Sequence, residues 1–399
     1  MRQKRHPGAQ WTARRAAFLV VLLALFIAIP APAGRFETAT IPPAPLGPLG
    51  PLGPLSPEPP ATPPAPELEG AIPEVASPDP ALDAAAPGCN RRHCAFLPMA
   101  VQGQSGGQTG GSPLSRSAAV DFYRQNYLPA SNVTPGWNGN INACSAGQTS
   151  QPFRDAVLSR INYFRVMAGI PPLEGLDSLY NDIDQKAALM MSANNALSHT
   201  PPNNWRCFTP EGRDGAGSSN LYLGAFGPNA ITGYMRDPGA GNTAAGHRRW
   251  ILYPQSKRLG TGDIPGGSGF SQSNALRSWD NNFGGPRPAT RDTFVAWPPP
   301  GFVPYPVVFA RWSFAYPNAN FDSATVSMSR GGAAVPVTRY ATANGYGENT
   351  LVWLVNNMND GADWPRPAAD EAYTVTIRNV IIDGQSREFT YTVTVINPE

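Results

Sequence analysis

A proline-rich segment near the start of the chain limits where a folded domain can begin. Residues 35–88 contain the run "IPPAPLGPLGPLGPLSPEPPATPPAPELEG", in which the triplet PLG occurs three times in succession. The segment has almost no aromatic or β-branched runs, so it cannot bury a hydrophobic core. We therefore expect residues 34–88 to be an extended spacer with polyproline character, and the globular part must lie beyond residue 88.

The first 33 residues have the organisation of a secretory signal peptide. The first fifteen include five Arg or Lys residues, and the apolar run "AAFLVVLLALFIAI" comes next, at 16–29. That run is shorter than the roughly 20 residues that a membrane span needs. Ala31-Pro32-Ala33 fits the small-residue pattern of a cleavage site. We predict a signal peptide over residues 1–33, with an uncleaved signal anchor as the alternative. The protein is then secreted or tethered to the outer surface, with no other expected membrane contact.

The charge of the chain argues against nucleic-acid binding. Charged residues make up 15% of the sequence, and the formal net charge is +2. Removing the signal peptide takes away five basic residues and no acidic residue. The basic pairs Arg91-Arg92 and Arg248-Arg249 are isolated, so no basic stripe is present.

The four cysteines indicate two disulfide bonds. An even number of cysteines in an exported chain is typical of disulfide pairing. Cys89 and Cys94 are close enough in sequence to pair with each other, which leaves Cys144 to pair with Cys207. For the first pair, the alternative is a metal site that also uses His93.

Helical periodicity begins near Cys144, after a Cys pair and a Gly/Ser-rich linker over residues 89–143. Ser150 can cap the first helix, and Pro152 lies in its first turn. Apolar residues at helical spacing predict four helices, at about residues 150–169, 178–197, 230–236 and 242–252.

From about Phe302 the pattern changes to short runs rich in Val, Thr and Tyr. In the last run, alternate residues from Phe389 to Val395 are apolar, which gives one buried face. Asp383-Gly384 between the last two runs is a hairpin signal. We predict a small all-β, immunoglobulin-like sandwich over residues 301–399.

The chain has four histidines, and two of them lie in the helical region. His199 comes just past the second expected helix, and His247 lies in the fourth, 48 positions later. Imidazole is a common zinc ligand and the usual general base near neutral pH. Their spacing alone is no motif, and each histidine could instead satisfy a local hydrogen bond.

The sequence around these histidines resembles the CAP superfamily, also called the SCP-like or cysteine-rich secretory protein domain, in its bacterial form. Two of the matching segments carry His199 and His247. The match rests on five segments in order between about residues 150 and 262: "LSRINYFRVMAGIPPL", "ALSHTP", "GSSNLYLG", "AITGYMRDPG" and "GHRRWILYPQSKRLGTG".

The resemblance implies an α+β protein: an α-β-α sandwich CAP domain over residues 144–300, followed by the β-sandwich. It also implies a cleft in which His199 and His247 meet two acids, and which in some members holds a divalent metal. Ser219 stands where the family has the first of these acids. Asp237 is nearest to the second, and Glu211 could substitute for the missing one.

These residues lead to three functional expectations, and the sequence leaves open whether the protein is an enzyme. In the first, a cleft formed by His199, His247, Ser219 and Asn220 binds a small apolar, lipid, sterol-like or cell-wall ligand, with little or no catalysis. In the second, His199 and His247 hold zinc in a peptidase-like hydrolase, with Asp237 as a further catalytic residue. In the third, the protein is structural or adhesive. The missing acid favours the first, because two imidazoles and a hydroxyl offset little of a metal's charge.

Overall fold

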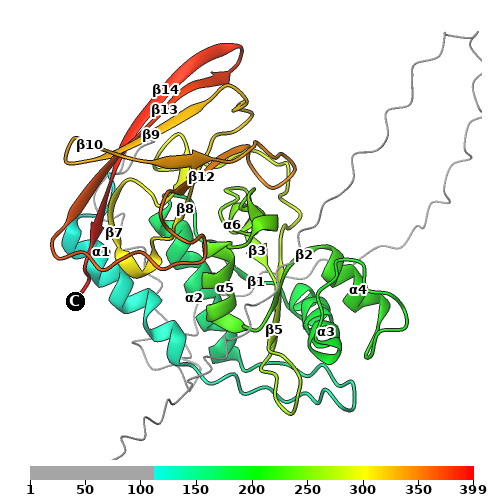
Figure 1. Cartoon of the computed structure of the whole chain (residues 1–399). Coiled ribbons are helices and arrows are strands. Elements are labelled where there is room, and N and C mark those ends of the chain that lie inside the picture. Colours follow the sequence, from blue (N-terminus) through cyan, green and yellow to red (C-terminus); the bar gives the residue numbers. More distant parts are fainter. Residues whose placement is uncertain (1–111) are drawn as a thin grey trace, which may run out of the picture.

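A computed structural model describes residues 112–399 of the chain (Figure 1). The predicted signal peptide, the spacer and the Cys89–Cys94 pair lie outside these residues. Within residues 112–399, no helix is long and apolar enough to cross a membrane.

The first part of the described chain is mainly helical. Ser150 caps α2, because its hydroxyl accepts the N–H of Phe153, and Asp177 caps α3 through the N–H groups of Leu179 and Tyr180. α3 ends at Asn195, which adopts the left-handed conformation (φ 47°) that commonly closes a helix. The α-helices are α1 (Arg116–Phe122), α2 (Gln151–Met167), α3 (Ser178–Asn194), α4 (Pro210–Gly217), α5 (Gly227–Arg236) and α6 (Gly246–Ile251).

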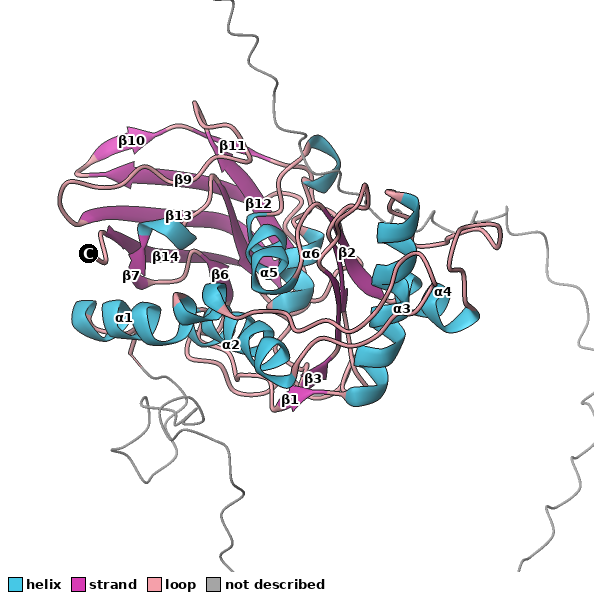
Figure 2. Ribbon diagram, turned by 90° about the horizontal axis from the view of Figure 1, so that it is seen from below, coloured by secondary structure: helices cyan, strands magenta, loops and turns pink. Residues whose placement is uncertain are grey.

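Three antiparallel strands form the middle layer of this part, in the order β2-β5-β4. They are β2 (Ser219–Leu223), β5 (Ser273–Arg277) and β4 (Thr261–Ile264). Leu221 and Leu223 pack with α3 and α4 on one face, and Tyr222 contacts Tyr234 of α5 on the other. The strands thus lie between two helical layers (Figure 2). A short parallel pair, β1 (Gly175–Leu176) with β3 (Arg258–Leu259), lies beside them.

The C-terminal part is built of two sheets. The five-stranded sheet has the order β10-β9-β13-β14-β7, and the four-stranded sheet has the order β11-β12-β8-β6. All pairings are antiparallel except that of β14 with β7. The strands are β6 (Val295–Trp297), β7 (Gly301–Pro304), β8 (Arg311–Ala315), β9 (Thr325–Arg330), β10 (Ala333–Val335), β11 (Val337–Arg339), β12 (Thr350–Val355), β13 (Glu371–Ile382) and β14 (Gln385–Ile396). The predicted α+β class with an all-β C-terminal region is confirmed.

The hairpin expected at Asp383-Gly384 joins β13 to β14. Both turn residues have positive φ, 49° and 75°, which is the requirement of a type I′ turn. On β14, Tyr391, Val393 and Val395 are buried at alternate positions, as the sequence pattern predicts.

A continuous hydrophobic core joins the helical part to the C-terminal sheets. Phe164 of α2 packs edge-to-face on Trp297 of β6, with ring centroids 5.0 Å apart. Both side chains are fully buried in a cluster that also includes Trp312 and Trp353 of the C-terminal sheets. The predicted domain boundaries, 144–300 and 301–399, stay predictions. Separating the two parts would expose this shared core.

The predicted Cys144–Cys207 disulfide is confirmed, with a Sγ–Sγ distance of 2.06 Å. It joins the loop before α2 to the loop between α3 and α4. The two cysteines are 63 positions apart, so the bond closes a long loop in the unfolded chain.

Replacing both Cys144 and Cys207 with Ser should lower the free energy of unfolding by about 4 kcal/mol, because the unfolded chain regains the entropy of this loop. Urea unfolding followed by tryptophan fluorescence measures the change. Wild-type protein treated with reductant should match the variant. An unfolding midpoint unaffected by reduction would contradict the prediction.

Candidate functional site

His247 and Asp237 form a buried pair between α5 and α6. His247 Nδ1 and Asp237 Oδ1 are 2.8 Å apart, and the exposed fractions of the two side chains are 9% and 0%. Asp237 comes directly after the last residue of α5 in the left-handed conformation (φ 51°), which directs the chain back toward α6. The pair therefore depends on the change of chain direction at the end of α5 as well as on the position of α6.

The second oxygen of Asp237 is also engaged. Oδ2 accepts the N–H of His247 at 3.0 Å and that of Arg248 at 3.4 Å. These are N–H groups of the first turn of α6, which have no partner inside a helix. Ala245, the N-cap residue of α6, has no side chain that could accept them. Asp237 thus caps α6 from ten positions earlier in the chain, and its negative charge lies at the favourable end of the helix.

Tyr234 and Asn220 complete the surroundings of His247. The Tyr234 ring stacks on the imidazole with centroids 5.4 Å apart. Its hydroxyl lies 2.9 Å from both the Asn220 carbonyl and Asn274 Oδ1. The Asn220 amide donates to the His247 carbonyl at 3.2 Å. β2, α5 and α6 therefore meet at this histidine.

His199 lies past the end of α3 and is half-buried. Its Nδ1 is 2.7 Å from the carbonyl of Ala216, in the last turn of α4. His199 and His247 thus each contact the short stretch from Ala216 to Asn220, one at each end. This stretch is the structural link between the two histidines.

Ser219 has a different orientation from Asn220. Its hydroxyl donates to Asp184 Oδ1 of α3 at 2.8 Å. Successive side chains of a strand point to opposite faces, so Ser219 faces α3 with Leu221, whereas Asn220 faces His247. Glu211, which the sequence suggested as a substitute for the missing acid, is exposed in the first turn of α4.

A known protein family matches the part of the chain that carries this site. The model of the cysteine-rich secretory protein family, CAP, matches residues 158–276, a span that includes both histidines, Asp237 and all but the last residue of the three central strands. This chain contains a CAP domain.

Other comparisons add little to this result. Comparison with the curated proteins gives no match. Among solved structures, the chain is similar to PcoC, a methionine rich copper resistance protein from Escherichia coli, at 18% sequence identity. The match covers 25% of this chain and 92% of PcoC, with a TM-score of 0.19. The selenomethionine form of PcoC matches at 15% identity over 25% of this chain and 94% of that one, also with a TM-score of 0.19. Scores this low support no conclusion about fold or function.

Asp184 is a buried acid of the CAP domain that the sequence reasoning missed. Burial raises its pKa to about 8, although the hydrogen bond from Ser219 lowers the pKa. Within residues 112–399, its Oδ2 makes no hydrogen bond. The sequence offered one signal for this contact, the alternation of side chains along β2. Ser219 shares the face of Leu221 and Leu223, so it must point at a helix.

Zinc binding by His199 and His247 stays a prediction. A catalytic zinc site uses three protein ligands. Among residues 112–399, no group of three or more His, Cys, Asp or Glu side chains could hold a metal ion. His199 and His247 supply two imidazoles at most, and Ser219 is directed to Asp184. We assign no chemical step to a metal.

An aromatic cluster begins on the same helix as His247. Trp250 of α6 lies 5.2 Å from Trp279 and 5.8 Å from Phe283 between ring centroids. Tyr253 lies 5.6 Å from Phe283. Trp250 and Trp279 are half-buried, whereas Phe283 is 54% exposed. We call these four residues the aromatic cluster.

The raised pKa of Asp184 predicts a pH dependence of stability. An acid whose pKa is raised by folding stays protonated in the folded state while it ionises in the unfolded state. The free energy of unfolding should therefore fall by about 1 kcal/mol per pH unit as the pH rises from 5 to 8. Asp184→Asn should remove this component, which urea unfolding at pH 5, 6.5 and 8 measures.

Asp182→Asn is the matched control, because Asp182 is exposed and lies two positions earlier on α3. It should keep the wild-type pH dependence. An Asp184→Asn variant with an unchanged pH profile would show that this carboxyl is not the group responsible.

Asp237→Ala should lower the free energy of unfolding by about 3 kcal/mol, because it removes the acceptor of the first N–H groups of α6 and the carboxylate paired with His247 Nδ1. Asp363→Ala removes an exposed carboxylate that pairs with Arg236, and it should cost less than about 1 kcal/mol. Equal losses for the two variants in chemical unfolding would argue against the capping role.

Proposed function

We propose that this protein is an extracellular CAP-domain protein that binds a small apolar ligand beside His247, with little or no catalysis. The ligand is a lipid, a sterol-like molecule or the apolar part of a cell-wall component. The observation that carries the proposal is the aromatic cluster, which begins on α6 and reaches the surface at Phe283. The extracellular location rests on the predicted signal peptide, which lies outside the described residues.

The aromatic cluster offers a surface that water solvates poorly. Contiguous exposed apolar groups on a soluble protein commonly mark interaction sites. Aromatic rings bury a large area when a ligand covers them, and Trp also has an N–H that can donate a hydrogen bond. The described chain has three exposed large hydrophobic residues: Leu128, Leu179 and Phe283. Of these, Phe283 belongs to the aromatic cluster.

The position of Trp250 connects the cluster to the histidine. Residues three positions apart lie on the same side of a helix, with Cβ atoms about 5–6 Å apart. His247 and Trp250 have this spacing on α6. The proposed ligand, which covers the cluster, thus lies about one helical turn from His247, whose side chain is 9% exposed.

The hydrogen bonds of Asp237 favour ligand binding over catalysis as the role of this site. Both of its oxygens accept hydrogen bonds from α6, so the carboxylate is occupied in holding the helix. Ser219, at the position of the family's first acid, faces Asp184 on the other side of β2. Asp237 thus holds the His247 imidazole in place, and the residue at the position of the family's first acid does not face that imidazole.

One observation favours the hydrolase as a second candidate. A carboxylate hydrogen-bonded to Nδ1 orients an imidazole as a general base, as in other His-carboxylate pairs. Under this alternative the full chain hydrolyses a peptide or ester substrate, and His247→Ala abolishes the turnover. Sensitivity of the turnover to a chelator would separate the metal-dependent form of the hydrolase from a metal-free one.

Phe283→Ser should weaken the binding of an apolar probe by about tenfold, because burial of an aromatic side chain contributes about 1.5–3 kcal/mol. Fluorescence titration of the full chain with cis-parinaric acid and with a fluorescent sterol measures the affinity. Quenching of Trp250 and Trp279 by the bound probe gives a second readout.

Leu179→Ser is the matched control, because Leu179 is 63% exposed and lies on α3 outside the aromatic cluster. It should leave the affinity unchanged. Failure of both probes to bind, or equal weakening by the two variants, would refute the proposed ligand site.

A further inference from the structure

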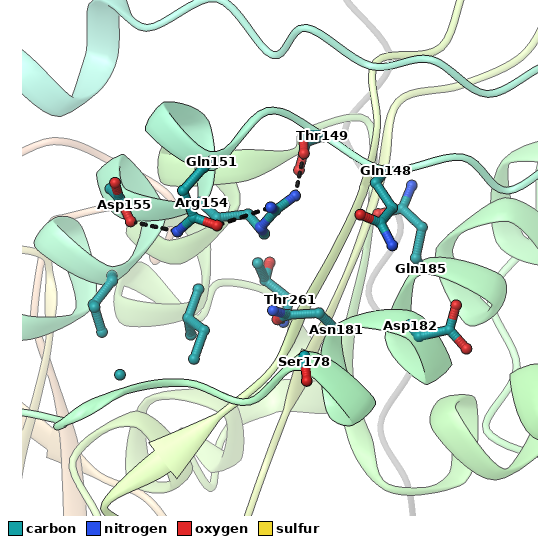
Figure 3. A pocket seen from close by; sticks show the side chains of 13 residues that line it. Gln148, Thr149, Gln151, Arg154, Asp155, Ser178, Asn181, Asp182, Gln185 and Thr261 are labelled. Carbon is teal, nitrogen blue, oxygen red and sulfur yellow. Dashed lines mark hydrogen bonds between the residues drawn. The ribbon is translucent and has the colours of Figure 1, made fainter. Parts of the chain in front are cut away.

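A polar pocket lies apart from the histidines, between the first turns of α2 and α3 (Figure 3). Its volume is about 310 Å³, at the small end of the ~300–1,000 Å³ range of small-molecule sites. The loop before α2, β1 and Thr261 of β4 complete its wall. The pocket shares no lining residue with the surroundings of His199 and His247.

The pocket lining is polar but nearly balanced in charge. Ten of its thirteen residues have polar side chains, and none is aromatic. Arg154 and Asp155 contribute opposite charges, and the remaining acid, Asp182, is paired with Lys186 at 2.9 Å. A lining of this kind favours a neutral ligand with many hydrogen-bonding groups over an anion, a cation or an apolar molecule.

Four side-chain groups of the lining have no partner within the described chain. The Thr149 side chain lies in the wall of the pocket, and its hydroxyl makes no hydrogen bond within residues 112–399. The amide of Gln148, the hydroxyl of Ser178 and the Nδ2 group of Asn181 also make no hydrogen bond within residues 112–399. Polar groups that line a pocket and have no protein partner are available to hydrogen-bond a ligand and to fix its orientation.

The other polar groups of the wall are fixed by the protein itself. Arg154 donates to Gln151 Oε1 at 2.9 Å and also to the carbonyl of Thr149. Asn181 Oδ1 accepts the N–H of Thr261 at 2.8 Å, which holds the amide so that its Nδ2 remains available. Gln185 is bonded through both ends of its amide to the backbone of Asp263. The site is therefore preformed, which lowers the entropic cost of binding.

We infer that this pocket binds a neutral carbohydrate, as a free mono- or disaccharide or as the end of a polysaccharide. A sugar hydroxyl both donates and accepts hydrogen bonds, as do the Thr149 and Ser178 hydroxyls, and the amides of Gln148 and Asn181 offer both functions side by side. The pocket does not depend on the ligand proposed for the aromatic cluster, and the two sites can be tested separately.

The test is isothermal titration of the full chain with neutral sugars, using N-acetylglucosamine, N,N′-diacetylchitobiose, glucose and cellobiose. Glucuronate and glucosamine serve as the charged counterparts. At least one neutral sugar should bind saturably at millimolar concentration, and more tightly than its charged counterpart. Thr149→Val removes the hydroxyl without breaking a hydrogen bond of the protein, so it should weaken sugar binding about three- to tenfold at an unchanged unfolding midpoint.

Gln148→Ala is a second variant with the same expectation, since this exposed side chain also makes no hydrogen bond in the described chain. Thr394→Val is the matched control, because its hydroxyl has no partner within residues 112–399 and lies on β14, away from the pocket. Phe283→Ser should also leave sugar binding unchanged, which separates this site from the aromatic cluster.

Retention on insoluble chitin or peptidoglycan distinguishes the two sources of the sugar. Retention that soluble sugar competes away and that Thr149→Val weakens would assign the ligand to a polysaccharide end. Soluble binding without retention would assign it to a free sugar. The inference is overturned if no neutral sugar binds and no polysaccharide retains the protein, if a charged sugar binds more tightly, or if neither Thr149→Val nor Gln148→Ala changes the affinity.

Discussion

Two fully buried guanidinium groups hold the loop on which the histidine site depends. Arg311 of β8 donates to the carbonyls of Asp237, Gly239 and Asn242. Arg248 of α6 donates to Met235 and Arg236 at the end of α5, and to Ser313 Oγ beside Arg311. A buried charge without partners is very costly, so each guanidinium requires these acceptors where they are. The end of α5, the start of α6 and the C-terminal sheet are thereby fixed relative to one another.

This arrangement explains why a helix of only six residues can hold the His247 imidazole in a fixed position. Isolated helices of this length are not stable in water, so α6 is formed by its tertiary contacts. Asp237 supplies its cap, and Arg249 ties it to the carbonyls of Ala343 and Glu348 in the C-terminal part. The CAP domain and the sheets are thus joined by polar contacts at α6 as well as by the hydrophobic core around Trp297.

The sequence predicted those elements whose signals are local. Ser150 and Pro152 predicted the start of α2, and Asp383-Gly384 predicted the turn between β13 and β14, because caps and tight turns depend on a few adjacent residues. α4 was missed, since four of its eight residues are Gly or Pro, which are poor helix formers.

The site was less predictable because its contacts are long-range. Asp237 could be named from the family resemblance, but its capping of α6 depends on the fold. Asp184 gave no signal of its own, because an acid in an amphipathic helix is expected to face solvent. The pocket between α2 and α3 could not be predicted either, since its wall combines segments more than a hundred positions apart in the sequence.

The start and the end of the described chain lie side by side (Figure 1). Arg116, the first residue of α1, pairs with Asp370 at 2.8 Å, and Arg124 donates to the carbonyl of Pro398. α3 and α4 lie on the other side of the molecule. A segment joined to either end of residues 112–399 is thus attached at one pole, and an anchor there would leave the opposite pole, with α3 and α4, directed away from the point of attachment.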